Sequence, residues 1–126
     1  MSANIRSYEE LRLFQAAFAV AMEKFEVSRN FPKAEMFALT DQLRRSSRSV
    51  CNNLAEAGRK RRYEAAFIAK LNDCESEAAE TQVSLAFAAA CGYIDAPTRE
   101  RLEAEYEKII AQLVHMIEHA PQWLIR

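Results

Sequence analysis

Apolar residues recur at intervals of three and four along almost the whole chain. The longest such stripe comprises Phe67, Leu71, Cys74, Ala78, Thr81, Leu85 and Ala88. This spacing places all members of a stripe on one face of an α-helix. Only two glycines and three prolines occur among 126 residues, which is too few for a turn-rich β protein. The sequence therefore predicts an all-α protein, and its length predicts a single domain over residues 1–126.

Breaks in the apolar spacing set the limits of two helices in the first half of the chain. The first is expected over residues 7–27, with Ser7 as N-cap and a core stripe of Leu11, Phe14, Phe18, Ala21 and Phe25. Pro32 restricts the residue before it and is tolerated in a first helical turn. The second helix is therefore expected over residues 32–57, with Gly58 as its stop. Its core face comprises Leu39, Leu43, Val50 and Leu54.

The second half of the chain predicts two more helices. One carries the longest stripe and is expected over residues 63–91, with Gly92 in the left-handed conformation that ends helices. The other is expected over residues 98–119, with a stripe of Leu102, Tyr106, Ile109, Leu113 and Met116. Short connections between consecutive helices predict a left-handed, up-down-up-down four-helix bundle.

The last two helices carry more apolar residues than one core face needs. The additional ones are Ile68, Val83, Phe87, Ile110, Val114 and Ile117. A helix in a bundle buries about one face, so a second apolar stripe predicts association with another chain. A thicker core within one chain is the alternative, and the periodicity alone leaves both open.

The cysteines and the N-terminus bear on the cellular compartment. Cys51, Cys74 and Cys91 are odd in number and fall within helical patterns, so we expect core or interface residues rather than a disulfide framework. No apolar leader follows a basic N-terminus, and no run of eighteen apolar residues occurs. A cytoplasmic protein without a membrane partner is therefore expected.

Charge is distributed unevenly along the chain. The formal net charge is only -1, yet residues 44–62 contain seven basic residues and one acidic residue, which gives +6. Residues 1–43 sum to -1 and residues 63–126 to -6. Such a chain can bind anions through its basic segment, or can pack that segment against acidic helices of its own or a neighbouring chain.

The basic segment is the candidate binding site. Its members are Arg44, Arg45 and Arg48 on the outward face of the second helix, and Arg59, Lys60, Arg61 and Arg62 in the link that follows. Arginine suits phosphate because its planar donors can engage two oxygens at once. We therefore expect contacts to the phosphate backbone of RNA or DNA without base recognition. Ser46, Ser49 and Asn53 lie on a flank of this helix, where small polar side chains allow another helix to approach closely.

No catalytic or cofactor site is expected. Residues 115–119, "HMIEH", formally match a zinc-binding H-x-x-E-H pattern, but a third protein ligand is missing and Pro121 follows closely. These histidines are expected at the end of a helix, near its free carbonyls. Two glycines do not make a phosphate-binding loop, and Glu-x-x-His pairs for a di-iron site are absent from the sequence.

Residues 31–58, "FPKAEMFALTDQLRRSSRSVCNNLAEAG", resemble a known bacterial family. Its signature is F-P-x-x-E-x-F/Y-x-L-x-x-Q-L-R-R-x-x-x-S-V/I-x-x-N-I/L-A-E-G. The matching positions are Phe31, Pro32, Glu35, Phe37, Leu39, Gln42, Leu43, Arg44, Arg45, Ser49, Val50, Asn53, Leu54, Ala55 and Glu56. The family comprises four-helix-bundle proteins encoded in intervening sequences of large-subunit ribosomal RNA genes. It is related to accessory proteins of diversity-generating retroelements.

The resemblance implies a non-enzymatic homo-oligomer, typically a pentameric ring, in which Pro32, Gln42, Ser49, Asn53 and Glu56 have structural roles. Ala57 replaces the family's glycine after the glutamate, so the following turn is expected to differ. The small patch expected in the third helix is also replaced, by residues 72–75, "NDCE". The leading hypothesis is a nucleic-acid-binding oligomer. The alternative is a structural or protein-docking oligomer whose basic residues stay within its own interfaces.

Overall fold

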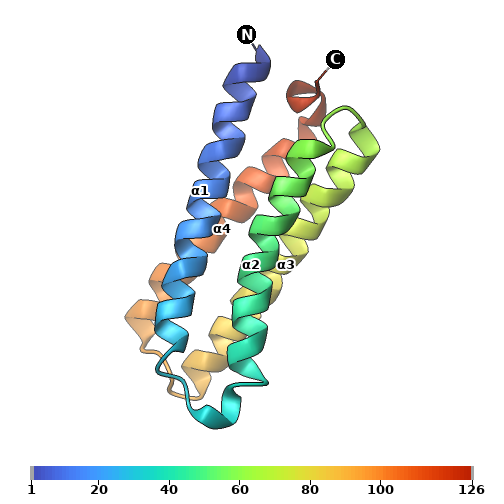
Figure 1. The fold of residues 1–126 in the computed structure, drawn as a ribbon. Helices are drawn as coiled ribbons and strands as arrows, with labels where there is room; N and C mark the ends of the chain where they lie inside the picture. The colour runs from blue at the N-terminus through green and yellow to red at the C-terminus, as the bar shows by residue number, and fades with distance from the viewer. Residues whose placement is uncertain (1, 126) are drawn as a thin grey trace.

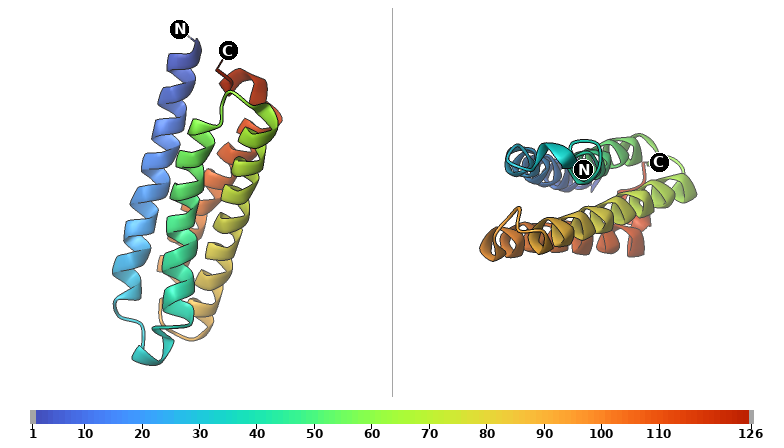
Figure 2. Two further views of the ribbon diagram at one scale, coloured as in Figure 1. Left: turned by 45° about the vertical axis from the view of Figure 1, so that its right-hand side comes forward. Right: turned by 90° about the horizontal axis from the view of Figure 1, so that it is seen from below.

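The computed structural model describes residues 2–125, with side chains from residue 12 onward. Its elements are α1 (Ser2–Ser28), η1 (Lys33–Glu35), α2 (Leu39–Arg59), α3 (Glu64–Ala90), α4 (Ala96–Glu118) and η2 (Ala120–Trp123), where η denotes a short 3-10 helix. Consecutive α-helices run in opposite directions (Figure 1), and α1 and α2 form one layer while α3 and α4 form the other (Figure 2). The described residues include no strand. The prediction of an all-α, four-helix bundle is confirmed.

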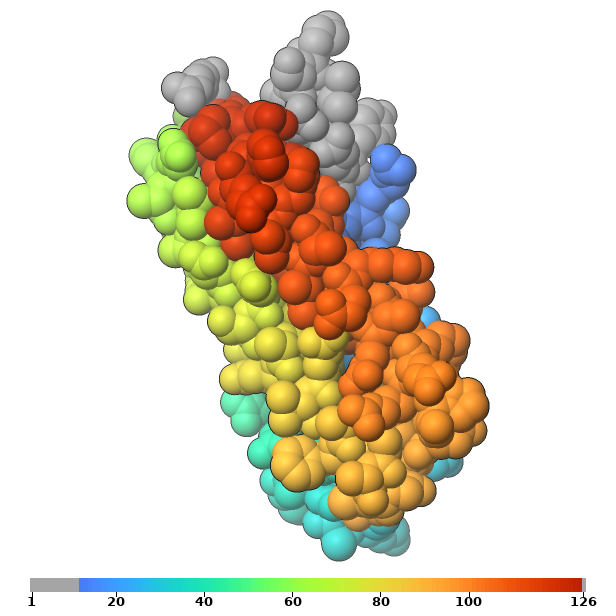
Figure 3. Space-filling view, turned by 180° about the vertical axis from the view of Figure 1, so that it is seen from behind, coloured from blue at the N-terminus to red at the C-terminus, as the bar shows by residue number. Residues whose placement is uncertain are grey.

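The two ends of the bundle are closed differently. At one end the α2–α3 link lies beside the C-terminal segment, where the backbone N–H of Ile125 donates to the carbonyl of Arg61 at 3.0 Å. At the other end Tyr93 of the α3–α4 turn donates its hydroxyl to Glu35 at 2.8 Å, and its ring lies 5.4 Å from that of Phe31. On the face opposite α2, α3 and α4 lie side by side along their length (Figure 3).

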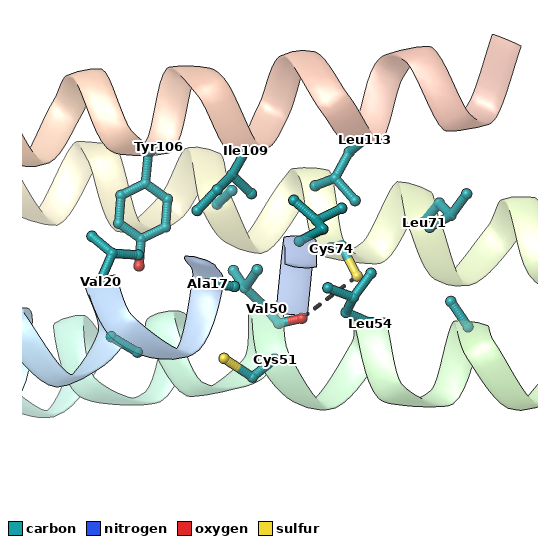
Figure 4. Close-up of a cluster of buried hydrophobic side chains, with 14 of the residues drawn as sticks. Ala17, Val20, Val50, Cys51, Leu54, Leu71, Cys74, Tyr106, Ile109 and Leu113 are labelled. Carbon is teal, nitrogen blue, oxygen red and sulfur yellow. Dashed lines mark hydrogen bonds between the residues drawn. The ribbon is translucent and has the colours of Figure 1, made fainter. Parts of the chain in front are cut away.

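Side chains from all four helices meet in the core (Figure 4). The predicted core faces of α2, α3 and α4 are all buried, and every member of the long α3 stripe is fully buried. The thiol of Cys74 donates to the carbonyl of Val50 at 3.6 Å across the α2–α3 contact. Cys51 is also buried, whereas Cys91 is exposed at the end of α3. The interpretation of two cysteines as core residues is therefore confirmed.

The predicted core face of α1 is wrong in part, because of its members Ala21 is buried and Phe14 packs against the core, but the main buried stripe lies elsewhere. The buried residues are Leu13, Ala17, Val20, Ala21 and Lys24, whereas Phe18 is 53% exposed and Phe14 and Phe25 are only half-buried. The side chain of Leu11 lies outside the described residues. Because residues 13–22 are apolar on every side, two stripes with the same spacing were available, and the larger aromatic side chains indicated the outer one.

Two helix ends also differ from expectation. α1 begins at Ser2, so Ser7 lies within the helix instead of capping it. α2 begins only at Leu39, because η1 and a turn follow Pro32. The carboxylate of Glu35 accepts a hydrogen bond from the backbone N–H of Leu39 at 3.4 Å, which satisfies one free donor at this helix start.

Both glycines were predicted to end a helix, and the structure confirms this for one of them. Gly92 has φ 78° and ends α3 as expected, while Gly58 lies inside α2, which continues to Arg59. The backbone N–H groups of Gly92 and Tyr93 donate to the carbonyls of Ala89 and Ala88 at 3.0 and 2.8 Å. These bonds satisfy carbonyls at the end of α3 that the helix itself leaves free.

The additional apolar residues of α3 and α4 divide into two groups. Ile68, Ile110 and Ile117 are half-buried and pack against the core, so they thicken it, and Val114 is half-buried as well. Val83 and Phe87 are 56% and 60% exposed on the outward face of α3. The thick-core alternative therefore describes α4, while α3 keeps an uncovered apolar face.

Candidate functional site

The three arginines of α2 do not share one environment. Arg44 is half-buried, its Nε donates to the hydroxyl of Ser28 at 2.8 Å, and its guanidinium lies 4.7 Å from the ring centroid of Phe25. Both partners belong to the last turns of α1, which lie alongside the start of α2. The expectation that Arg44 projects freely from the bundle is therefore wrong, because this side chain joins two helices.

Arg45 and Arg48 lie on the surface as expected. Arg45 forms an ion pair with Asp41 one turn earlier, at 3.4 Å, but its side chain is 78% exposed. An exposed pair of this kind contributes little stability and leaves the guanidinium accessible to another partner. The guanidinium of Arg48 lies 5.9 Å from the ring centroid of Phe25, at the outer edge of a cation–π contact.

The last residue of α2 and the link to α3 present three exposed cations, Arg59, Lys60 and Arg62. Within the described chain none of the three forms an ion pair. Arg61 differs, because it is half-buried and its Nε donates to the carbonyl of Gly58 at 3.3 Å. The expectation that all four project together is corrected: Arg61 orders the link, and its neighbours present charge to solvent.

The basic residues thus form two clusters. Arg59 follows Arg48 by eleven positions in α2. At 1.5 Å per residue, the two clusters are therefore about 16 Å apart along the helix. We name Arg59, Lys60 and Arg62 the link cluster and Arg45 and Arg48 the mid-helix pair. The link cluster lies at the end of the bundle, and the mid-helix pair lies on its side.

A groove of about 740 Å³ runs between α2 and α3 next to the mid-helix pair. It is lined by Gln42, Arg45, Ser46, Arg48, Ser49, Asn52, Glu77, Glu80, Val83 and Ser84. Burial, followed by repulsion from Glu80, raises the pKa of Glu77, while Arg45 opposes the rise. Two carboxylates facing two guanidinium groups give the groove no excess of positive charge, so it is less suited to phosphate than the link cluster.

The five motif residues have different surroundings, and one of them, Glu56, links α2 to α3. Asn53 donates to the carbonyl and hydroxyl of Ser49, both at 3.0 Å, and Glu56 forms an ion pair with Lys70 of α3 at 2.6 Å. The hydrogen bond from Lys70 lowers the pKa of Glu56. Pro32 is the N-cap of η1, and Gln42 is exposed in the groove. Nearby, the hydroxyls of Ser46 and Thr81 are 2.8 Å apart, as the small flank of α2 allows.

The two histidines lie at the end of α4. Nδ1 of His119 is 2.9 Å from the carbonyl of His115, and the two ring centroids are 4.3 Å apart. A histidine at a helix end was expected to meet such a carbonyl. Among residues 12–125, whose side chains the structure describes, no three His, Cys, Asp or Glu are grouped so that they could hold a metal ion.

Sequence reasoning missed a buried polar pair between α1 and α4. Lys24 is fully buried with its Nζ 4.4 Å from the ring centroid of Tyr106, and in the described part of the chain neither Nζ nor the Tyr106 hydroxyl has a hydrogen-bond partner. Burial lowers the pKa of Lys24 to about 7, although Glu103 and Glu23 oppose the change. Burial also raises the pKa of Tyr106. The only sequence signal was the place of Lys24 on the stripe of Leu13, Ala17 and Val20.

Comparisons with known proteins place the chain in a family. Residues 9–115 match the family described as 23S rRNA-intervening sequence protein. A crystal structure of a protein of unknown function from the S23 ribosomal protein family of Bacteroides thetaiotaomicron has the same fold, with a TM-score of 0.76 at 24% identity. The match covers 83% of this chain and 97% of the other. No curated protein matches the chain. None of the helices in the described range is long and apolar enough to cross a membrane.

Proposed function

The chain belongs to the 23S rRNA-intervening sequence protein family, and from that premise we propose a non-enzymatic, self-associating protein that binds the phosphate backbone of RNA or DNA. The observation that carries the proposal is the link cluster. Three exposed cations occupy the turn between two helices, where their charges face solvent without a carboxylate partner in the described chain. A cytoplasmic location and a relation to retroelement accessory proteins also remain predictions from the sequence.

The mechanism is the release of counterions. Each phosphate neutralised by an arginine or lysine releases cations condensed on the nucleic acid, so binding weakens as salt rises. The members of the link cluster are exposed at the end of the bundle, which favours backbone contacts without base recognition. Arg44 and Arg61 are assigned structural roles, so five of the seven predicted residues carry the proposed contact.

A titration against single- and double-stranded RNA and DNA tests the proposal. If about six phosphates are contacted, affinity for a duplex should fall roughly a thousandfold between 50 and 200 mM salt, largely regardless of sequence. Replacing Arg59, Lys60 and Arg62 with alanine should weaken binding and reduce the slope of log affinity against log salt by about 0.9 per lost contact. Lys108→Ala, an exposed cation on α4, is the matched control and should change little.

Two results would contradict the proposal. If the triple variant binds as tightly as the unmodified protein, the link cluster does not contact phosphate. If no nucleic acid is retained even at low salt, the structural or protein-docking alternative is favoured, with the basic residues engaged in contacts between chains.

A further inference from the structure

An exposed aromatic residue ends the α2–α3 link. Tyr63 follows Arg62 directly, precedes the first residue of α3, and is 66% exposed. It occupies the N-cap position of α3, but its side chain makes no capping hydrogen bond. Within the described residues its ring contacts no other ring or cation, and its hydroxyl has no hydrogen-bond partner. The ring of Tyr63 is therefore open to another molecule.

A tight turn holds Tyr63 beside the link cluster. The backbone N–H of Tyr63 donates to the carbonyl of Lys60 at 2.9 Å, and the N–H of Lys60 donates to the carbonyl of Ala57 at 2.9 Å. A turn closed in this way brings its first and last Cα atoms to within about 7 Å of each other. The side chains of Arg59, Lys60, Arg62 and Tyr63 therefore leave the backbone within one short segment at the end of the bundle (Figure 1).

The backbone of this segment is fixed on both sides. Nε of Arg61 donates to the carbonyl of Gly58 at 3.3 Å, and the carbonyl of Arg61 accepts from the backbone N–H of Ile125 at 3.0 Å. The carbonyl of Tyr63 accepts a bond from the N–H of Phe67 at 2.9 Å, which joins it to α3. A fixed backbone reduces the entropy cost of bringing several side chains to one ligand. The link thus presents its exposed side chains from positions that are set before a ligand binds.

Nearby carboxylates do not cancel the charge of the link cluster. Glu56, in the last turns of α2, already forms an ion pair with Lys70 at 2.6 Å. Glu64 is exposed directly after Tyr63, but it is one negative charge against three cations. The surface around Tyr63 therefore combines an excess of positive charge with an accessible aromatic ring.

This combination fits a single-stranded nucleic acid. Proteins that bind single strands neutralise the phosphates with cations and stack bases on aromatic side chains. Inside a duplex each base is stacked between its neighbours, so only an unpaired base can lie against a protein ring. Phe37, 92% exposed at the opposite end of the bundle, provides a comparison, because it is an exposed ring remote from the link cluster.

We propose that Tyr63 stacks on an unpaired base of a single-stranded nucleic acid, while Arg59, Lys60 and Arg62 contact the phosphates beside that base. This inference rests on the phosphate binding in the proposed function and adds a base contact at the same site. Because every base has a π face, such stacking is tolerant of sequence. The ligand class is therefore single-stranded RNA or DNA, bound without a sequence preference.

Anisotropy titrations with two single strands of equal charge test the proposal. One is a thymidine strand of about twelve nucleotides, and the other is an abasic strand with the same number of phosphates. The unmodified protein should bind the thymidine strand more tightly. Tyr63→Ala should weaken that binding at least about fivefold and leave the affinity for the abasic strand unchanged. Tyr63→Phe keeps the ring and should bind like the unmodified protein, and Phe37→Ala is the control that should also change nothing.

Fluorescence provides a second readout that a purely structural role of Tyr63 would not affect. The single tryptophan of the chain, Trp123, is only 1% exposed, so its emission should not respond to either strand. Tyr63→Trp places a second indole at the proposed contact. The emission of this variant should be quenched by the thymidine strand, because a base stacks on the indole, and should stay constant with the abasic strand.

The possible failures are distinguishable. If the unmodified protein binds neither strand at low salt, the proposed function itself is wrong. If it binds both strands, but Tyr63→Ala binds the thymidine strand equally well, the phosphate contact stands and the stacking is wrong. If Tyr63→Ala weakens both strands equally, Tyr63 supports the link and does not contact a base. Repeating the titrations with a uridine strand shows whether RNA or DNA is bound more tightly, and the loss in Tyr63→Ala is expected with both.

Discussion

The side chain of Lys24 is fully buried between α1 and α4. In the part of the chain whose side chains are described, the face of Tyr106 and the carboxylates of Glu23 and Glu103 compensate its ammonium group for lost water. Because burial disfavours the charged form, its pKa falls from 10.5 to about 7. In the unfolded chain Lys24 stays protonated up to about pH 10. Between these values the unfolded state binds more protons than the native state, so native stability rises with pH.

Replacing Lys24 with methionine should therefore stabilise the protein at neutral pH. The variant avoids the cost of burying or deprotonating an ammonium group, which we expect to be on the order of 3 kcal/mol at pH 7, and the gain should shrink as pH approaches 10. Denaturant unfolding at several pH values measures it. Lys108→Met, exposed on α4, is the control without such a trend. A stability difference that does not change between pH 7 and pH 10 would refute the assignment.

Arg44 and Arg45 are adjacent in sequence and should differ in their effect on stability. Arg44 donates to Ser28 and lies over Phe25, so Arg44→Ala removes a charged hydrogen bond and a cation–π contact between α1 and α2. We expect a loss of about 1–2 kcal/mol in the free energy of unfolding. Arg45→Ala should cost less than about 0.5 kcal/mol, because its ion pair is exposed. Equal losses in thermal or denaturant unfolding would show that Arg44 does not join the helices.

At the scale of the elements, the two glycines provide a matched pair. Gly92 has φ 78°, a conformation that costs any residue with a Cβ, so Gly92→Ala should destabilise the protein by about 1 kcal/mol. Gly58 lies inside α2 without a positive φ, so Gly58→Ala should stabilise that helix by about 0.5–1 kcal/mol. Unfolding curves of both variants test this, and effects of the same sign would contradict it.

The elements also show which parts of the fold the sequence predicts. In α4 and over residues 64–80 of α3, charged residues occupy the positions between stripes, so only one face can be the core, and both stripes were predicted correctly. In α1, residues 13–22 carry no charge, so spacing alone could not choose between two faces. The correct face also carries Lys24, which argued against it. The segment of α1 in which two faces have the same apolar spacing is thus also the segment whose outer apolar face is left exposed.

The candidate site was predictable only in part, for a similar reason. The sequence places seven basic residues within residues 44–62, but it does not show which lie beside another helix. Arg44 meets the end of α1 and Arg61 meets the C-terminal segment, and both contacts join residues distant in the sequence. The basic residues that stay exposed are those whose positions face no other helix or segment. Charge counting thus located the segment, and tertiary packing decided which side chains remain accessible.

At the scale of the whole molecule, assembly and nucleic-acid binding should reinforce each other. A segment charge of +6 repeated in the expected five-chain ring gives +30. Once one chain has bound a long nucleic acid, its neighbours meet the same strand at a high effective concentration, and weak contacts add together. Affinity should therefore depend on self-association, and a substitution that breaks the contacts between chains should weaken binding although it removes no cation.

Phe18 and Met22 are exposed apolar side chains of α1, and a variant with Phe18→Gln and Met22→Gln keeps all seven basic residues of the segment. If these side chains take part in self-association, the variant should bind a long duplex at least about a hundredfold more weakly than the unmodified protein, because its contacts no longer add. The salt dependence should also become shallower, since each chain neutralises fewer phosphates by itself. A duplex of about ten base pairs, which only one or two chains can reach, should bind both proteins with similar affinity. Anisotropy titrations with both lengths at several salt concentrations distinguish the cases. If the variant loses affinity equally for both lengths, Phe18 and Met22 themselves contact the nucleic acid. If it loses affinity for neither, these two side chains do not contribute to binding through self-association.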